Sequence, residues 1–126
     1  MRLLLDTVTF IWAVSSPERI SKKAMRSLQH SEARLEMSSI SLSEIAIKQA
    51  LGKLNFSPED ARIGIADLTL RVLPYTADHA FHLFGLPHHH GDPFDRQIIA
   101  QALAEDIPVV TSDKKFKLYK GFEVIW

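Results

Sequence analysis

The chain has 126 residues, 46% hydrophobic and 24% charged, a composition typical of one soluble globular domain and unlike that of a disordered segment. Its 15 basic and 15 acidic residues give a formal net charge of zero, so no global positive field attracts nucleic acid and any affinity for it must be local. The absence of cysteine excludes disulfides and thiolate metal sites, which suits a reducing compartment.

The longest apolar stretches, residues 3–5 and residues 8–14 with Thr9 as an interruption, fall well short of the ~20 residues that a membrane span requires. Asp6 lies where the apolar centre of a signal peptide would be. We therefore expect no membrane span, no signal peptide and a cytoplasmic protein.

The first third of the chain alternates between strand and helix patterns. Residues 2–5 are a short apolar run ending at Asp6, which is typical of a strand buried on both faces of a parallel sheet, and residues 7–14 are expected to begin a helix at once. Ser21 can cap a helix with Ala24 and Leu28 on one face. Residues 35–40 then predict a second strand.

Two helix starts follow in the middle of the chain. Ser41 and Glu44 have the spacing of a capping box, which predicts a helix over 41–51 with Gly52 in a left-handed conformation just past its end. Ser57, followed by proline and two acids, predicts a helix to about residue 69.

Residues 71–73 predict a weak strand, and Thr76 would cap a short helix. The spacing of Ala77, Ala80, Phe81 and Phe84 gives that helix an aromatic inner face, so we expect both phenylalanines in the core.

The clearest helix begins at Asp92-Pro93-Phe94-Asp95 and carries one apolar stripe, formed by Ile98, Ile99, Ala102 and Leu103. Residues 109–111 and 123–125 complete the strands. Strands separated by helices predict an α/β fold, a three-layer α/β/α sandwich around a mostly parallel sheet. No linker or repeat interrupts the chain, so we expect a single domain over residues 1–126.

Four acids are placed where such a sheet binds ligands, beyond the carboxyl ends of its strands. Asp6 directly follows the first strand, Asp113 lies two residues beyond the strand that ends at residue 111, and Glu44 and Asp95 fall in the first turns of helices. Carboxylates gathered at one rim repel one another unless a cation neutralises them, and their oxygens suit Mg²⁺ or Mn²⁺. The lack of cysteine and of any His-x₃-His pair argues against zinc.

These segments, Leu-Leu-Leu-Asp6-Thr, Ser-Leu-Ser-Glu44-Ile-Ala-Ile-Lys, Asp92-Pro-Phe-Asp95-Arg and Thr111-Ser-Asp113, resemble the motifs of VapC-type PIN-domain toxins in order and spacing. The resemblance runs over nearly the whole chain. It implies a PIN-like sandwich acting as a metal-dependent endoribonuclease, the toxin of a VapBC-type toxin-antitoxin pair. Its implied partners are an RNA substrate and a small cognate antitoxin, and the implied assembly is a homodimer.

The resemblance also carries over Asp6, Glu44, Asp95 and Asp113 as catalytic residues and ligands of Mg²⁺, for which Mn²⁺ would substitute. Asp92 stays ambiguous, because the family places two acids around Pro-Phe. The implied mechanism is in-line attack of an activated water on a phosphodiester, giving 5′-phosphate and 3′-hydroxyl ends. Asp6 and Asp95 would hold the ion, Asp113 would complete its shell, and Glu44 would orient or deprotonate the water.

Each acid also has a structural interpretation. Glu44 could close a capping box with Ser41 or pair with Lys48, Asp95 could be the capping partner of Asp92, and Asp6 and Asp113 could cap the segments that follow them. Only the register of all four favours a shared site.

Basic residues are the remaining candidates. His88, His89 and His90 are adjacent in a loop, so their side chains are not expected to converge on one ion and rather form a polar loop near the RNA entrance. Arg96, Lys114 and Lys115 could contact RNA phosphates, with the solvated surface as the alternative.

Two other functions remain open. A PIN-like module without catalysis would bind nucleic acid or a partner and leave RNA intact. A phosphoacceptor signalling domain would have adjacent acids after the first strand, but Asp6 is followed by Thr7.

Overall fold

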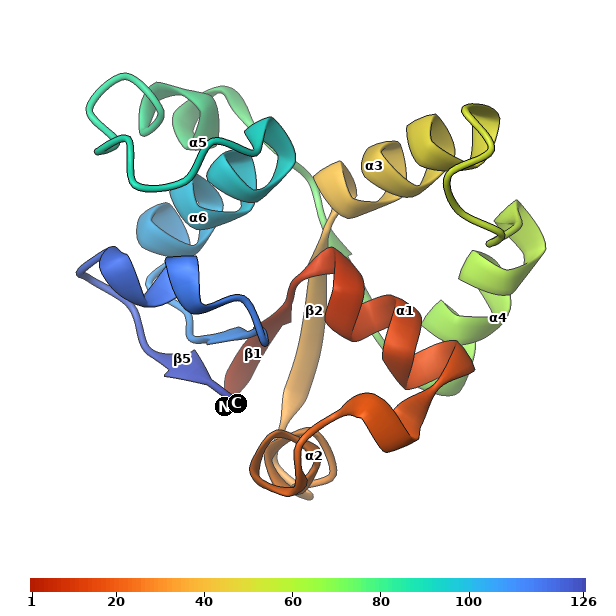
Figure 1. Cartoon of the computed structure of the whole chain (residues 1–126). Coiled ribbons are helices and arrows are strands. Elements are labelled where there is room, and N and C mark those ends of the chain that lie inside the picture. The colour runs from red at the N-terminus through yellow and green to blue at the C-terminus, as the bar shows by residue number, and fades with distance from the viewer.

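The computed structural model describes residues 1–126 and contains one five-stranded sheet with the strand order β3-β2-β1-β4-β5 (Figure 1). Every neighbouring pair of strands is parallel. The strands are β1 (Arg2–Leu5), β2 (Arg34–Ser38), β3 (Arg71–Leu73), β4 (Val109–Val110) and β5 (Val124–Ile125). The central strand β1 is buried on both faces, as its apolar run predicts.

Six α-helices and two 3₁₀-helices connect the strands. They are α1 (Thr7–Ser15), η1 (Pro17–Arg19), α2 (Lys22–Leu28), α3 (Ser39–Ala50), α4 (Pro58–Asp67), α5 (Ala77–Phe81), α6 (Pro93–Glu105) and η2 (Lys114–Leu118). None of these helices has both the length and the apolar character that a bilayer crossing demands.

Helices cover both faces of the sheet, with α1 and α4 on one side and α5 and α6 on the other in Figure 1. Leu5 packs with Phe10 of α1 and Ala61 of α4, whereas Leu4 packs with Ile98 and other α6 residues on the opposite face. Leu3 joins a third cluster with α2. The expected three-layer α/β/α sandwich is therefore confirmed.

The strand order also bears on the phosphoacceptor alternative. Flavodoxin-like signalling domains have the order 2-1-3-4-5, whereas β1 of this chain lies between β2 and β4 and gives the order 3-2-1-4-5. The chain does not have the phosphoacceptor fold.

Helix α3 begins earlier than the sequence predicts. The expected strand over 35–40 ends at Ser38, whose side chain accepts a hydrogen bond from the backbone N–H of Ile40 at 3.1 Å and caps α3. Ser41 lies inside the helix and accepts a hydrogen bond from the hydroxyl of Thr7 at 2.8 Å. The expected capping box of Ser41 and Glu44 is wrong, because Ser38 can cap as well as Ser41 and the earlier start buries Ser41 against α1.

The prediction that α5 has an aromatic inner face is also wrong. Phe81 and Phe84 are 68% and 88% exposed and stack on each other with ring centroids 5.8 Å apart. The helix ends at Phe81, and the following turn directs Leu83 and Leu86 into the core instead.

Other local predictions hold. Ser57 and Asp60 form a reciprocal capping box at α4, Ser21 caps α2, and Gly52 has a φ of +70° just past α3. Helix α4 ends at Asp67, two residues before the expected end, and Thr69 adopts a positive φ of 48°.

Candidate metal centre

The acids gather where the chain order reverses within the sheet. The connection after β1 leads to β2 on one side, and the connection after β4 leads to β5 on the other. Crevices beyond the carboxyl ends of two such strands are the usual ligand sites of open parallel sheets. Asp6 follows β1 and Asp113 follows β4, so these two residues meet at this switch point.

Asp6 is buried, with 4% of its surface exposed. Its Oδ1 accepts a hydrogen bond from the backbone N–H of Thr9 at 2.9 Å, which caps α1, and its Oδ2 accepts one from the Thr111 hydroxyl at 2.6 Å. Burial raises the pKa of Asp6, while the bonds from Thr111 and Thr9 oppose that rise. Asp6 is thus a helix cap that also ties β1 to the end of β4.

At the start of α6, Asp92 is the cap. Its Oδ1 accepts hydrogen bonds from the backbone N–H groups of Phe94 at 2.8 Å and Asp95 at 3.1 Å. The Asp95 carboxylate does not return the bond, because the backbone N–H of Asp92 donates to His90 Nδ1 instead. The interpretation of Asp95 as a capping partner is therefore wrong. The Asp95 carboxylate instead lies near those of Asp6, Glu44 and Asp113, and we call these four residues the acidic rim.

The pKa of Asp95 reflects both its burial and the negative charges around it. Burial and the negative charges of Asp92, Asp6, Glu44 and Asp113 raise the pKa of Asp95 to about 8. The other three sequence-predicted acids are therefore close enough to act on Asp95. In the absence of a cation, this rim stabilises the protonated form of one of its own carboxylates.

Glu44 reaches the rim from α3 and is 3% exposed. Its Oε2 lies 2.5 Å from the Nζ of Lys48, so the predicted ion pair within α3 is confirmed. Its Oε1 is buried and accepts no hydrogen bond. A buried carboxylate oxygen without a partner is costly, and a cation beside it would remove that cost.

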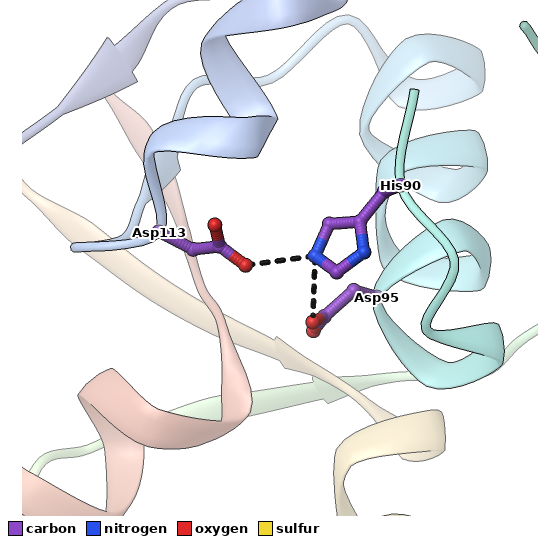
Figure 2. A group of neighbouring side chains, drawn as sticks. All are labelled: His90, Asp95 and Asp113. Carbon is purple, nitrogen blue, oxygen red and sulfur yellow. Dashed lines mark hydrogen bonds and ion pairs between the residues drawn. The ribbon is translucent and has the colours of Figure 1, made fainter. Parts of the chain in front are cut away.

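Asp113 and Asp95 both contact His90, which was not among the predicted metal ligands. His90 Nε2 lies 2.7 Å from Asp113 Oδ2 and 3.1 Å from Asp95 Oδ2, and Figure 2 shows its ring between the two carboxylates. One ligand atom from each of these three residues lies within 4.8 Å of the others. Asp6 and Glu44 lie outside that group of three.

The expectation that the three histidines would not converge is correct for the run as a whole. Only His90 is buried, however, while His88 and His89 are exposed. The signal in the sequence was its position two residues before the capping Asp92, which fixes the loop against the start of α6.

Of the three basic residues predicted to contact RNA, Arg96 is bonded to the protein itself and the two lysines are exposed. The Arg96 guanidinium donates to the backbone carbonyl of Pro87 at 3.0 Å and to three further oxygens of the same region at 3.4 Å, those of Leu86, His90 and Tyr119. Its donors hold the histidine loop. Lys114 and Lys115 are exposed at the start of η2, and the backbone N–H of Lys115 donates to Asp113 Oδ1 at 2.9 Å, so the capping interpretation of Asp113 is confirmed.

Fold and site together define a class of protein: a parallel α/β sandwich with a carboxylate-rich rim at its topological switch point, whose oxygen donors and orphaned Glu44 oxygen fit a hard divalent cation. The family model described as PIN domain matches residues 3–121. The chain belongs to the PIN domain family, a family of nucleases.

Several solved structures have a similar fold. The chain resembles VapBC2 from Rickettsia felis bound to a promoter DNA fragment, with a TM-score of 0.69, 20% identity, and coverage of 98% of this chain and 97% of that one. DNA-bound VapBC from Salmonella typhimurium gives a TM-score of 0.66 at 22% identity, covering 98% and 96% of the two chains. VapBC-5 from Mycobacterium tuberculosis gives 0.60 at 19% identity, again covering 98% and 96%. Comparison with curated protein sequences gives no match.

Proposed function

We propose that this chain is a Mg²⁺-dependent endoribonuclease that also works with Mn²⁺. The observation that carries the proposal is the burial of Asp95 among other negative charges, which together raise its pKa to about 8 at the switch point of a PIN-family sheet. Such an arrangement is unfavourable by itself and becomes favourable with a divalent cation. A cation held by carboxylates is in turn suited to the phosphate groups of a nucleic acid.

The contacts of each acidic residue suggest its role in the proposed reaction. When bound, the cation supplies positive charge that offsets the charge developing on the phosphodiester and makes the attacking water more acidic. Asp95 and Asp6 would hold it, Asp113 would complete the set, and Asp92 would keep the first turn of α6 in place through its cap. The free Oε1 of Glu44 can orient the water and accept its proton, since Oε2 is taken up by Lys48.

We further propose that the chain is the toxin of a toxin-antitoxin pair and acts in the cytoplasm. The fold similarity to the VapBC complexes supports this role. An apolar cavity of about 390 Å³ lies between α3 and α4, lined by Leu42, Ile45, Ala46, Phe56, Pro58 and Ala61. Because α3 also carries Glu44, an antitoxin segment seated there could extend a basic side chain into the acidic rim.

A homodimer is part of the same proposal. The stacked and exposed rings of Phe81 and Phe84 give the chain an apolar surface that a second copy could cover. Analytical ultracentrifugation of the chain and of a Phe81→Ser, Phe84→Ser double variant tests it, and a monomeric parent would contradict it.

The activity is tested with purified protein and end-labelled single-stranded RNA, in Mg²⁺, in Mn²⁺ and in EDTA, with single-stranded DNA as a parallel substrate. We expect cleavage of RNA with either ion, none in EDTA, and new ends carrying 5′-phosphates. Asp95→Asn should abolish cleavage, while Asp67→Asn, an exposed acid on α4 away from the rim, should not. Undiminished cutting in EDTA would contradict the metal mechanism, and metal-dependent RNA binding without cleavage would favour the inactive binding module.

A further inference from the structure

His90 is held beside the acidic rim by contacts of its backbone and of both ring nitrogens. It is 6% exposed, its backbone N–H donates to the Tyr119 hydroxyl at 3.0 Å, and its ring meets the edge of Phe116 with centroids 5.9 Å apart. Its Nδ1 and Nε2 are both engaged by polar partners. A side chain fixed in this way has one orientation available to it.

The partners of the ring determine which nitrogen carries the proton. Nδ1 accepts a hydrogen bond from the backbone N–H of Asp92 at 3.1 Å, so Nδ1 presents its lone pair to that donor. The neutral ring then carries its proton on Nε2, which faces Asp113 Oδ2 at 2.7 Å and Asp95 Oδ2 at 3.1 Å. A protonated nitrogen has no lone pair for a cation, so His90 is a donor to the carboxylates.

This donor lies between two groups that would otherwise move apart. Asp95 lies on α6 and Asp113 follows β4, and when both carboxylates are ionised their like charges favour separation. Nε2–H donates to Asp113 Oδ2 and lies 3.1 Å from Asp95 Oδ2, and its position between the two carboxylates opposes that separation. Asp113 Oδ1 is fixed by the N–H of Lys115, while Asp95 Oδ1 takes part in no hydrogen bond and is free to bind a cation.

We infer that His90 is a positioning residue of the metal site, whose Nε2–H holds the carboxylates of Asp95 and Asp113 at the separation that the cation needs. The inference rests on the proposed function, because it assigns a role toward the same ion. Outer hydrogen-bond partners of metal ligands commonly change metal affinity by about 10- to 100-fold when removed. His90 is expected to act at this level without touching the ion.

The first test measures Mn²⁺ affinity by isothermal titration calorimetry, independently of cleavage. His90→Ala should weaken binding by about 10- to 100-fold. His90→Gln places an amide donor near the position of Nε2 and should stay within a few-fold of the parent. His88→Ala, which removes an exposed histidine of the same loop, should leave affinity unchanged. Equal affinity of the parent and His90→Ala would overturn the inference and leave the proposed function intact.

The second test needs no variant, so it holds even if His90→Ala folds poorly. Pulsed electron paramagnetic resonance of the Mn²⁺-loaded parent protein detects nitrogen directly bonded to the ion. We expect no such nitrogen coupling. If a nitrogen coupling is seen, labelling the histidines with ¹⁵N tests its source. Replacement of the coupling by a ¹⁵N signal would mean that a histidine binds the ion, and His90 is the histidine grouped with Asp95 and Asp113, so its role as a donor would be overturned. A parent protein that binds no Mn²⁺ at all would instead overturn the proposed function, and this inference with it.

Discussion

Lys48 Nζ lies 2.5 Å from Glu44 Oε2, one helical turn apart on α3, and supplies a positive charge at the edge of the acidic rim. The hydrogen bond to Glu44 is the largest cause of the raised pKa of Lys48, and the charges of Asp92 and Asp95 add to it. Lys48 therefore offsets part of the repulsion among the acids before any metal binds.

Replacing Lys48 should make the stability of the folded protein depend more strongly on bound metal. Because the Lys48 side chain is 40% exposed and screened by water, we expect Lys48→Met to lower the free energy of unfolding in EDTA by only about 1 kcal/mol. The rise in melting temperature on adding Mg²⁺ should become larger than in the parent. Thermal melts in EDTA and in Mg²⁺ measure both effects, with Lys53→Met, an exposed lysine just past the end of α3, as the control. An unchanged response to Mg²⁺ would argue that Glu44 is remote from the ion.

Asp6→Asn should separate catalysis from capping. Asn caps a helix about as well as Asp, so α1 should keep its start, while the loss of a buried charge should raise the melting temperature measured in EDTA. Cleavage should be abolished, and most of the stabilisation by Mg²⁺ should be lost. Asp60→Asn, in the exposed capping box of α4, is the matched control. If Asp6→Asn still cuts RNA and responds to Mg²⁺ like the parent, the proposed site is wrong.

The contacts of Glu105 predict a pH dependence of stability that does not involve the acidic rim. Hydrogen bonds from His79 and Arg2, both at 3.0 Å, lower the pKa of Glu105 from its ordinary 4.5. A lowered pKa in the folded state means that this contribution to stability is present above pH 4.5 and is lost as the pH falls through the folded-state value. Glu105→Gln should therefore melt below the parent at pH 7, and the difference should shrink as the pH falls below 4.5. A difference that stays constant down to pH 3 would contradict this assignment.

Gly64 permits the close approach of α4 to α1. A Cβ at this position would lie 2.4 Å from Val14 Cγ2 and 3.3 Å from the Phe10 ring. Gly64→Ala gains helix propensity of about 1 kcal/mol but must displace a β-branched side chain, so we expect a net loss of roughly 1–2 kcal/mol in chemical denaturation. Gly85→Ala meets nothing within 4 Å and should be neutral or slightly stabilising. Equal effects of the two substitutions would show that α1 and α4 separate freely.

Much of the fold follows from local signals in the sequence. The apolar run before Asp6, the caps at Ser21, Ser57 and Asp92, and the stripe of α6 each depend on nearby residues, and each is found as predicted. The same signals could not choose between Ser38 and Ser41 as the start of α3, because both residues are competent caps. The choice depends on the contact of Ser41 with Thr7, 34 positions away.

The site was predictable to the extent that its residues follow strands or begin helices. Asp6, Glu44, Asp95 and Asp113 all reach one rim, as their placement indicates. The contacts of His90 and Arg96 could not be predicted, because they involve Asp113, Tyr119 and the loop carbonyls, none of which local spacing identifies. Phe81 lies inside α5 and is exposed because the buried side of this helix carries His79, which bonds to Glu105 of α6, a contact that the apolar spacing does not reveal.

The hydrogen bond from Thr111 to Asp6 joins residues that are 105 positions apart. Chains are synthesised from the N-terminus and begin to fold in that order, so Asp6 and Glu44 leave the ribosome long before β4 exists to bring Asp113 beside them. A nascent chain that has not yet produced β4 consequently holds only part of the rim. Whatever chemistry this protein performs on nucleic acid is therefore withheld until β4 and Asp113 have been synthesised and have packed beside β1, so the ribosome making the chain is not exposed to the assembled site before that point.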